Sequence, residues 1–251
     1  MVNVRACKDR EEWKKERHKG IGGSDASAVM GLNPYRNQLD IWRDKVGLAP
    51  NKTEEEDEDF KSAYLEYGTN AEEPIRKLFM LDYPQFTLYH NANAIFYRVD
   101  KDYMCGSLDG YLVANEDVKI TSYYQVSMLS GETDVPDSCY KTITKGMKGI
   151  LEIKTTEILS SMHKEKWHNQ VPVNYYIQLL HYMNVMNADF SILRVKLKTV
   201  DRWGIVKHSI RDYVFLRSDV EEDLAEEEQA ITDFWENYVE TKQEPPIKIN
   251  I

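Results

Sequence analysis

Residues 149–157 read GILEIKTTE, and this stretch decides the fold because it combines a strand signal with two charges. Its isoleucines and threonines favour an extended conformation. Side chains alternate along a strand, so Glu152 and Lys154 point to one face while Leu151 and Ile153 point to the other. We expect the apolar pair to anchor the strand in a core. An ordinary amphipathic strand shows the same pattern, so the meaning of the two charges depends on what the rest of the chain brings to their face.

The composition is that of a globular protein with one moderately large domain. Of 251 residues, 42% are hydrophobic and 29% are charged, and a chain of this length buries a sizeable core. We therefore expect a single domain over residues 1–251. There is no apolar run of about twenty residues and no basic-then-apolar start, so neither a membrane span nor a secretory signal is expected.

The cysteines indicate a reducing compartment, and we expect a cytoplasmic protein. They are three in number and far apart, which fits neither a disulfide framework nor a CxxC metal site. An iron–sulfur cluster, which needs about four thiolates, is excluded on the same count.

The charge balance limits the classes of partner without settling them. The formal net charge is −10, which argues against a protein that coats nucleic acid without sequence preference. Much of the excess lies in two acidic runs, residues 54–59 and 221–228, which we interpret as solvated surface. A cluster of metal-binding carboxylates is itself acidic, so an enzyme that acts on nucleic acid stays possible.

Helical and extended patterns follow one another in three blocks. Helical spacing comes first, with an N-cap at Ser24 or Asp25 and with Ile75, Leu78, Phe79 and Leu81 turned inward. These helices are expected at residues 9–18, 24–31, 39–47, 59–68 and 71–83.

Short β-branched or aromatic runs make up the second block, and a helix, two strands and a last helix make up the third. The strands of the second block are expected at residues 86–90, 94–99, 103–113, 123–129, 140–145 and 149–155. The third block is expected as a helix at 171–187, strands at 190–198 and 204–216, and a helix at 218–240. This order predicts an α/β domain with a central mixed β-sheet flanked by helices. Residues 115–148 are expected as an inserted β-hairpin, and 217–251 as a C-terminal helix and tail.

Acidic side chains at two other places in the chain could join the two charges of residues 149–157 in one site. Asp109 stands where a strand meets a glycine turn, and Glu72 and Glu73 begin a helical segment. Carboxylates are the hard oxygen ligands that Mg²⁺ prefers, and a bound metal activates water and offsets charge on a phosphate. A nearby lysine orients or helps to deprotonate that water. A site for metal-dependent phosphodiester hydrolysis would need these groups, but an E-x-K pair on an amphipathic strand is common and an isolated Asp-Gly is usually only a turn.

The helix expected at 171–187 carries a polar stripe. Gln178 and Tyr182 lie four residues apart, so they share one helical face among apolar neighbours. A plain core helix does not need such a stripe. The alternative is a buried amide and hydroxyl that are satisfied by backbone groups.

Taken in order, these motifs resemble the PD-(D/E)XK nuclease superfamily, and they run over most of the chain. The motifs are G-x-x-x-E (Gly68 to Glu72), Asp109, E-x-K (Glu152 and Lys154) and Q-x-x-x-Y (Gln178 to Tyr182). Within the superfamily, IGGSDASAVMGLNPY (residues 21–35) with the preceding Arg17 resembles the YqaJ-type viral recombinases, the group of lambda exonuclease. Each motif alone is unspecific, and the ordered set is specific.

The resemblance implies a restriction-endonuclease-like core and a Mg²⁺-dependent 5′-to-3′ exonuclease, with Mn²⁺ as a substitute. Such an enzyme digests one strand of linear double-stranded DNA and leaves 3′ overhangs for a phage single-strand annealing protein. Members of the group are often homo-oligomers, commonly trimeric rings, and they act in a bacterial host cell from a phage or prophage gene.

The resemblance also implies a catalytic set. Asp109 and Glu152 would be metal ligands together with the carbonyl of Ile153, and Lys154 would be the catalytic lysine. Glu72 would be the helix carboxylate at the metal. Glu73 is the second choice, because a glutamate directly before a proline also occurs in this motif.

The remaining implied residues bind DNA. Gln178 would lie beside the scissile phosphate. Arg17 and Ser24, together with Tyr182, would hold a 5′-phosphate, and a guanidinium and a helix N-terminus both favour phosphate. A plain N-cap is the competing interpretation of Ser24.

The sequence departs from the family pattern at one place, and two other functions remain as alternatives. Between Asp109 and Glu152 stand 42 residues, more than in the best-known relatives, and the extra hairpin could contact DNA or another subunit. A restriction-like or repair endonuclease on the same core is one rival. A catalytically inactive protein that binds DNA ends is the other.

Overall fold

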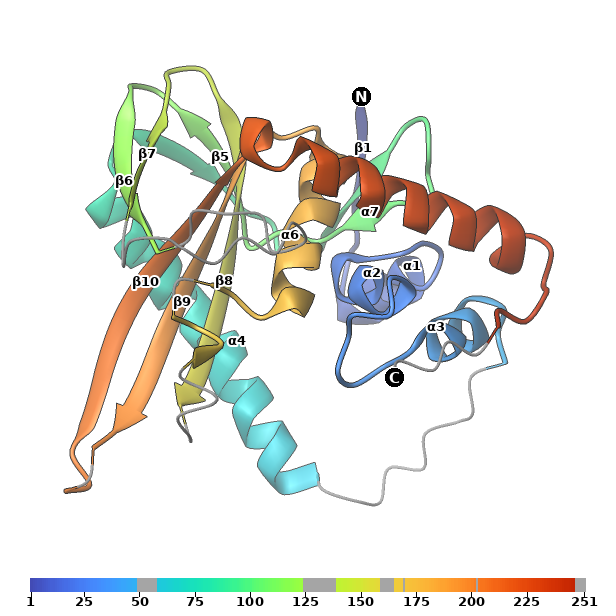
Figure 1. Cartoon of the computed structure of the whole chain (residues 1–251), viewed down its shortest axis with the longest axis horizontal. Coiled ribbons are helices and arrows are strands. Elements are labelled where there is room, and N and C mark those ends of the chain that lie inside the picture. Colours follow the sequence, from blue (N-terminus) through green and yellow to red (C-terminus); the bar gives the residue numbers. More distant parts are fainter. Residues whose placement is uncertain (49–57, 124–138, 159–164, 169, 202, 247–251) are drawn as a thin grey trace.

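A computed structural model describes residues 1–48, 58–123, 139–158, 165–168, 170–201 and 203–246. Figure 1 shows a twisted sheet with helix α4 (Glu58–Asp82) on one side and helix α6 (Val173–Met186) on the other. The remaining helices lie beyond α6. None of the helices in these ranges combines the length and the apolar character that crossing a membrane requires.

The central sheet has five strands in the order β10-β9-β8-β5-β2. Their bounds are Val206–Leu216, Phe190–Val200, Lys148–Ile158, Gly110–Ala114 and Phe86–Tyr89, in the same order. Neighbours are antiparallel except β8 and β9, which are parallel. Helix α6 (Val173–Met186) connects these two strands, as a crossover between parallel strands requires. The sheet is therefore mixed, as predicted.

Two short sheets lie beside the central one. In one, β3 (Ala94–Arg98) pairs with both β1 (Val2–Ala6) and β4 (Cys105–Gly106). In the other, β6 (Val118–Ser122) and β7 (Cys139–Ile143) pair antiparallel within the stretch expected as a hairpin. The sequence did not predict β1, because its side chains are mostly exposed and its pairing rests on backbone hydrogen bonds. Of the strand expected at 123–129, residues 124–129 lie outside the described residues.

The remaining helices agree with the predicted order but differ at two places. They are α1 (Arg10–Arg17), α2 (Gly23–Val29), α3 (Gln38–Lys45), α4 (Glu58–Asp82) and α7 (Glu221–Phe234), which a π turn continues to Val239. The prediction of Ser24 or Asp25 as N-cap is wrong. Gly22 is the N-cap, and Asp25 is the third helical residue, with its carboxylate 3.4 Å from the Gly22 nitrogen.

The prediction of two helices over residues 59–83 is also wrong, because α4 runs through Gly68 and Pro74 without a break. Pro74 lies on the exposed side, where the carbonyl group that loses its partner can meet water. Packing against the sheet holds the helix together, through Ile75 and Phe79.

The helix α4 buries one face only. Ile75 and Phe79 are buried as predicted, whereas Leu78 and Leu81 are 38% and 78% exposed. A helical stripe recurs every three to four residues, so four apolar positions within seven residues exceed the width of the buried face.

Two cores sandwich the central sheet. Side chains of α4 pack with Leu151 and Ile153 on one face. Side chains of α6 pack with Ile150 and Leu193 on the other face. Charged groups of β8 that point toward α6 must therefore lie where that core opens to solvent.

Candidate active site

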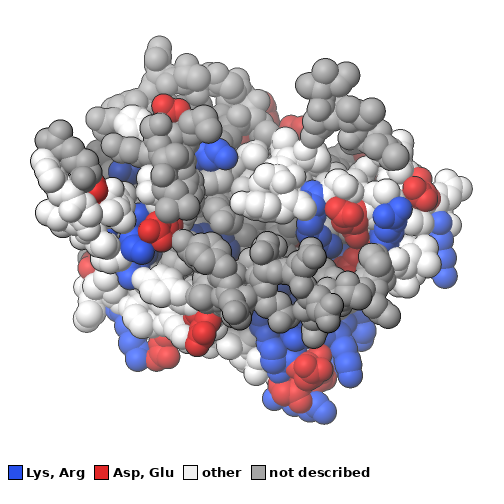
Figure 2. All heavy atoms as spheres, turned by 90° about the horizontal axis from the view of Figure 1, so that it is seen from below, with Lys and Arg blue, Asp and Glu red and all other residues white. Residues whose placement is uncertain are grey.

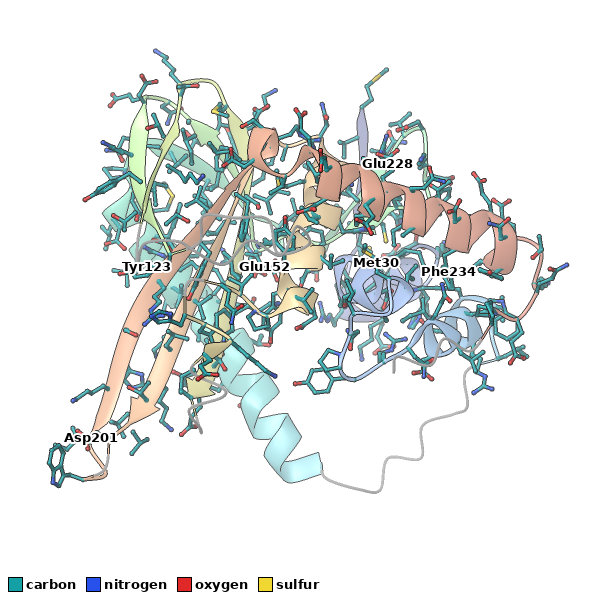
Figure 3. All side chains as sticks on the ribbon, viewed as in Figure 1. Met30, Tyr123, Glu152, Asp201, Glu228 and Phe234 are labelled. Carbon is teal, nitrogen blue, oxygen red and sulfur yellow. The ribbon has the colours of Figure 1, made fainter. Side chains whose placement is uncertain are left out.

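Strand β8 presents its two charges as the alternation predicted. Leu151 and Ile153 are buried in the core below the sheet, and Glu152 is buried on the α6 side. The Lys154 ammonium donates to Glu152 Oε1 at 2.6 Å. In Figure 3, Glu152 lies between β8 and α6.

Asp109 reaches this strand from the neighbouring one. It immediately precedes β5, and its Oδ2 accepts a hydrogen bond of 2.8 Å from the Ile153 backbone nitrogen. Arg76 of α4 donates from Nε to the Asp109 carbonyl oxygen at 2.7 Å. Glu72 lies one turn before Arg76 on the same helix and is half-buried. Asp109 and Glu152 thus lie along the middle of β8, and Glu72 is close enough for its charge to act on Glu152.

Helix α6 closes the other side with its polar stripe. Gln178 Nε2 donates to Glu152 Oε1 at 2.8 Å and to the Tyr182 hydroxyl at 3.0 Å. The alternative of a buried amide and hydroxyl satisfied by backbone groups is therefore wrong, because these two bond to each other and to the carboxylate. The stripe connects α6 to the charged pair of β8.

The first turn of α2 stands against the same stripe. The Arg17 guanidinium, at the end of α1, donates to the Ser24 hydroxyl. A Cβ atom on Gly23 would lie 2.5 Å from Tyr182 Cε1, so only glycine allows the helix to approach this closely. Arg17 and Ser24 are in this way held beside Gln178 and Tyr182.

One cavity of about 830 Å³ joins these parts. Of the residues predicted from the sequence it is lined by Arg17, Ser24, Glu72, Asp109, Glu152, Lys154, Gln178 and Tyr182. Ile153 does not line the cavity, and its side chain is buried in the core on the α4 side of the sheet. Glu73 points away, is exposed, and pairs with Lys77 at 2.6 Å. The structure therefore brings Glu72 and not Glu73 to the cavity.

The carboxylates raise one another's affinity for protons. Burial and the nearby Asp109 charge raise the pKa of Glu152, although Lys154 opposes the shift. Burial and Asp109 also raise the pKa of Glu72. Such crowding of negative charge is relieved when a cation lies among the carboxylates.

The oxygen atoms of this site fit a hard divalent cation that takes only a few of its ligands from the protein. Within the ranges that the structure describes, no three Asp, Glu, His or Cys side chains gather as a ready-made metal site. Asp109 and Glu152 currently accept hydrogen bonds from protein donors. Mg²⁺ is typically bound through one or two carboxylates and keeps several waters, so two carboxylates and one carbonyl suffice.

Several residues of the cavity were missed by sequence reasoning. They are Arg10, Trp13, Tyr35, His90, Ser107 and Tyr175. Arg10 stands two helical turns before Arg17, and Tyr175 stands one turn before Gln178, so helical spacing carried a signal for both. Tyr35 and Ser107 lie in loops, where no periodicity points to them.

The distribution of charged side chains on the described surface is compatible with a polyanionic partner. Figure 2 shows basic and acidic side chains interspersed over the face seen from below. Among the described residues of this face, the net charge of −10 is therefore not spread as a uniform acidic field.

Comparisons with known proteins agree on one family and one fold. The family model described as the YqaJ-like viral recombinase domain matches residues 12–189. The uncharacterized protein YqaJ of Bacillus subtilis (strain 168) is 28% identical over 182 residues, which cover 72% of this chain and 44% of that protein. The chain thus spans less than half of that relative's length.

The structural neighbours confirm the predicted fold class. A crystal structure of an alkaline exonuclease, LHK-Exo from Laribacter hongkongensis, superposes with a TM-score of 0.56 and 13% identity. The match covers 94% of this chain and 95% of that one. The same enzyme in complex with dAMP gives a TM-score of 0.52, also at 13% identity, over 93% of this chain and 94% of that one. The central mixed sheet with helices on both faces is that of the PD-(D/E)XK fold.

Proposed function

The chain belongs to the YqaJ-like viral recombinase domain family, and on that premise we propose that it is a Mg²⁺-dependent nuclease that acts on DNA. In its finer form the proposal is a 5′-to-3′ exonuclease that digests one strand of linear duplex DNA and leaves a 3′ overhang. The observation that carries it is the meeting of Asp109, Glu152 and Lys154 in one cavity. The fold likeness to an alkaline exonuclease supports the same class of activity.

The carboxylates at the middle of β8 would hold the metal. Asp109 and Glu152 would be its side-chain ligands, with the carbonyl of Ile153 as a third oxygen and Glu72 close by. When bound, Mg²⁺ activates a water molecule and offsets the charge that builds on the phosphate. Gln178 supports this arrangement from the protein side, because its amide fixes Glu152 Oε1 at 2.8 Å.

Lys154 is the cationic group of the chain at the scissile phosphate. Burial disfavours its charge, but the carboxylates of Glu152 and Asp109 outweigh burial and raise its pKa. The lysine is therefore an ammonium at neutral pH. It orients the attacking water and stabilises negative charge on the phosphate oxygens.

Arg17 and Ser24 would receive the 5′ end. Both line the cavity beside the catalytic carboxylates, and they already bond to each other through the Arg17 guanidinium. A guanidinium and the first turn of a helix both favour a phosphate group. A 5′-phosphate held there would fix which phosphodiester bond reaches Glu152 and Lys154.

A substrate comparison tests the proposal. Linear duplex DNA should be consumed from its ends in the presence of Mg²⁺, and a covalently closed circle should survive. Cutting of the circle would replace the exonuclease with an endonuclease on the same core. An absence of any digestion with Mg²⁺ or Mn²⁺ would leave an end-binding protein.

The biological setting follows from the same proposal. We place the activity in the cytoplasm of a bacterial host, from a phage or prophage gene, with a single-strand annealing protein as the user of the 3′ overhang. A ring-shaped homo-oligomer, such as a trimer, would keep the enzyme on its DNA. Light scattering of the purified protein tests the oligomer, and co-purification tests the annealing partner.

A further inference from the structure

Two helices form one wall of the cavity and run in opposite directions. The first turn of α2 meets the later part of α6, since Gly23 packs against Tyr182 and Gln178. The loop after α2, residues 31–34, meets residues 170–174 at the start of α6, where both line a shallow groove. The proposed 5′-phosphate pocket therefore lies at one end of this wall, and the loop after α2 lies at the other end.

Side-chain hydrogen bonds fix the loop after α2, which carries the exposed Tyr35. Asn33 Oδ1 accepts hydrogen bonds from the backbone nitrogens of Tyr35 at 2.8 Å and Arg36 at 3.0 Å. Asn33 Nδ2 donates to the Ser27 hydroxyl at 2.9 Å, and Arg36 donates to Asp25 Oδ1 at 2.9 Å. These bonds tie the loop to α2 on both sides of Tyr35.

Tyr35 is 86% exposed although it lines the cavity that contains Glu152 and Lys154. An exposed apolar ring on a fixed loop costs little conformational entropy when it binds a flat ligand. The position is thus suited to contact with something that enters the cavity.

Tyr175 lines the same cavity from the first turn of α6. Its ring stacks on Trp167 with centroids 5.8 Å apart and an interplanar angle of 29°. The Lys154 ammonium lies 5.2 Å from the ring centroid. Pro34 and Asn174, which directly precede Tyr35 and Tyr175, line the same groove. The two tyrosines therefore lie near each other, with Tyr175 packed against Trp167 and Tyr35 exposed.

We propose that Tyr35 and Tyr175 form a stacking platform for a nucleobase of the strand being cut. The proposal rests on the proposed nuclease function and assigns a subsite within it. Stacking on aromatic side chains is the usual, sequence-tolerant way in which proteins hold unpaired bases. A strand that is digested from its end one nucleotide at a time must present an unpaired base at the site.

The order of residues along α6 gives the position of that base. Tyr182 lies next to the phosphate pocket, Gln178 bonds to Glu152, and Tyr175 lies next to Lys154. From Tyr182 to Tyr175 the helix advances roughly 10 Å at 1.5 Å per residue. If the 5′-phosphate occupies the Arg17 end, the scissile phosphate lies in the middle. The tyrosines then receive the second nucleotide, on the 3′ side of the cut.

A binding cycle between protein and DNA tests this assignment. Dissociation constants are measured by fluorescence anisotropy for a 5′-phosphorylated duplex, with Ca²⁺ in place of Mg²⁺ so that no cleavage is needed. The duplex carries either a normal second nucleotide or an abasic one. The proteins are the wild type, Tyr35→Ala, Tyr35→Phe and, as a matched control, Tyr140→Ala, an exposed tyrosine on β7 outside the cavity.

We expect Tyr35→Ala to bind the normal duplex roughly tenfold more weakly, the size of one lost base–aromatic stack. Tyr35→Phe keeps the ring and should resemble the wild type. The abasic duplex should weaken binding to the wild type by at least the same factor. It should weaken binding to Tyr35→Ala by a smaller factor, because the contact with Tyr35 is already lost and only the contact with Tyr175 remains.

Equal losses for Tyr35→Ala on both duplexes, or no loss at all, would overturn the assignment. A third duplex carries the abasic site at the fifth nucleotide of the same strand. If Tyr35→Ala reduces the effect of that abasic site as well, the assignment to the second nucleotide is also overturned. The nuclease proposal fails separately, through the absence of Mg²⁺-dependent digestion by the wild type. A wild type that binds no DNA end would overturn both.

Discussion

The backbone nitrogen of Ile153 donates a hydrogen bond of 2.8 Å to Asp109 Oδ2. This bond joins the middle of the E-x-K motif to a carboxylate that comes from another strand. Along a strand the N–H and C=O groups of one residue point to the same side. The Ile153 carbonyl is therefore directed to the side where Asp109 lies. β5 pairs with β8 only as far as Leu151, so β5 offers that carbonyl no partner.

Asp109→Asn should abolish Mg²⁺-dependent digestion while leaving the fold intact. The amide oxygen can still accept the bond from Ile153, but the negative charge of the proposed metal ligand is lost. Repulsion of Glu152 and Glu72 is also relieved, so the melting temperature should be unchanged or higher. Glu73→Gln, which alters an exposed carboxylate outside the cavity, is the control and should digest DNA normally. A variant that digests at the wild-type rate would contradict the role of Asp109.

Mg²⁺ should stabilise the wild type and not Asp109→Asn. A ligand that binds only the folded state raises stability by about 2.7 kcal/mol at a hundred times its dissociation constant. Thermal unfolding at increasing MgCl₂, with NaCl held at matched ionic strength, measures the effect without any DNA. Equal shifts in both proteins would place the metal elsewhere.

Lys154→Ala should lose digestion but keep DNA-end binding. In the proposed mechanism the lysine acts on the scissile phosphate, whereas Arg17 and Ser24 hold the 5′ end, so digestion and binding should respond differently. We expect a fall in rate on the order of a hundredfold or more, as for loss of a group that stabilises transition-state charge. Parallel loss of binding and digestion would show that Lys154 mainly holds the substrate.

Arg17→Ala should remove a preference for 5′-phosphorylated ends. The guanidinium offers charge-assisted hydrogen bonds to a phosphate but gains little from a terminal hydroxyl. Initial digestion rates on duplexes with 5′-phosphate and 5′-hydroxyl ends give the preference as a ratio. The ratio should fall toward one in the variant, and an unchanged ratio would exclude Arg17 from the pocket.

The sequence predicted those parts of the site that regular periodicity governs. The alternation in β8 placed Glu152 and Lys154 on one face, and a spacing of four placed Gln178 beside Tyr182. Each rule needs only the local backbone geometry. Packing then fixed the partners, which local patterns cannot specify.

Loops and long-range packing account for what the sequence did not predict. Tyr35 is placed by hydrogen bonds from Asn33 and Arg36 to α2, and no repeat signals such a turn. The continuous α4 overrides local breaker signals at Gly68 and Pro74, because the sheet supports its apolar side. Strand β1 has few buried side chains, so it carries no alternation to detect.

His181 should make stability depend on pH. Its Nδ1 lies 2.7 Å from Glu227 Oε1, and its Nε2 lies 3.0 Å from the carbonyl oxygens of Ile21 and Cys105. Carbonyls and a carboxylate only accept hydrogen bonds, so both ring nitrogens carry a proton. Burial opposes this cation, but Glu227 and the carbonyls outweigh burial and raise the pKa of His181. The ring therefore connects α6 to Ile21, which precedes α2, and to Cys105 of β4.

The sign of the pH effect follows from the raised pKa. An unfolded histidine titrates near pH 6.5, so the stabilisation is complete below about that pH and is lost as the pH rises through the folded pKa. Urea unfolding between pH 6 and 9 should show the wild type losing stability with rising pH. His181→Gln should be less stable by about 3 kcal/mol, because Glu227 is left buried without its cation, and should show a flatter pH dependence. His208→Gln, which alters an exposed histidine on β10, should follow the wild type. If His181→Gln keeps the wild-type slope, another group controls the pH dependence.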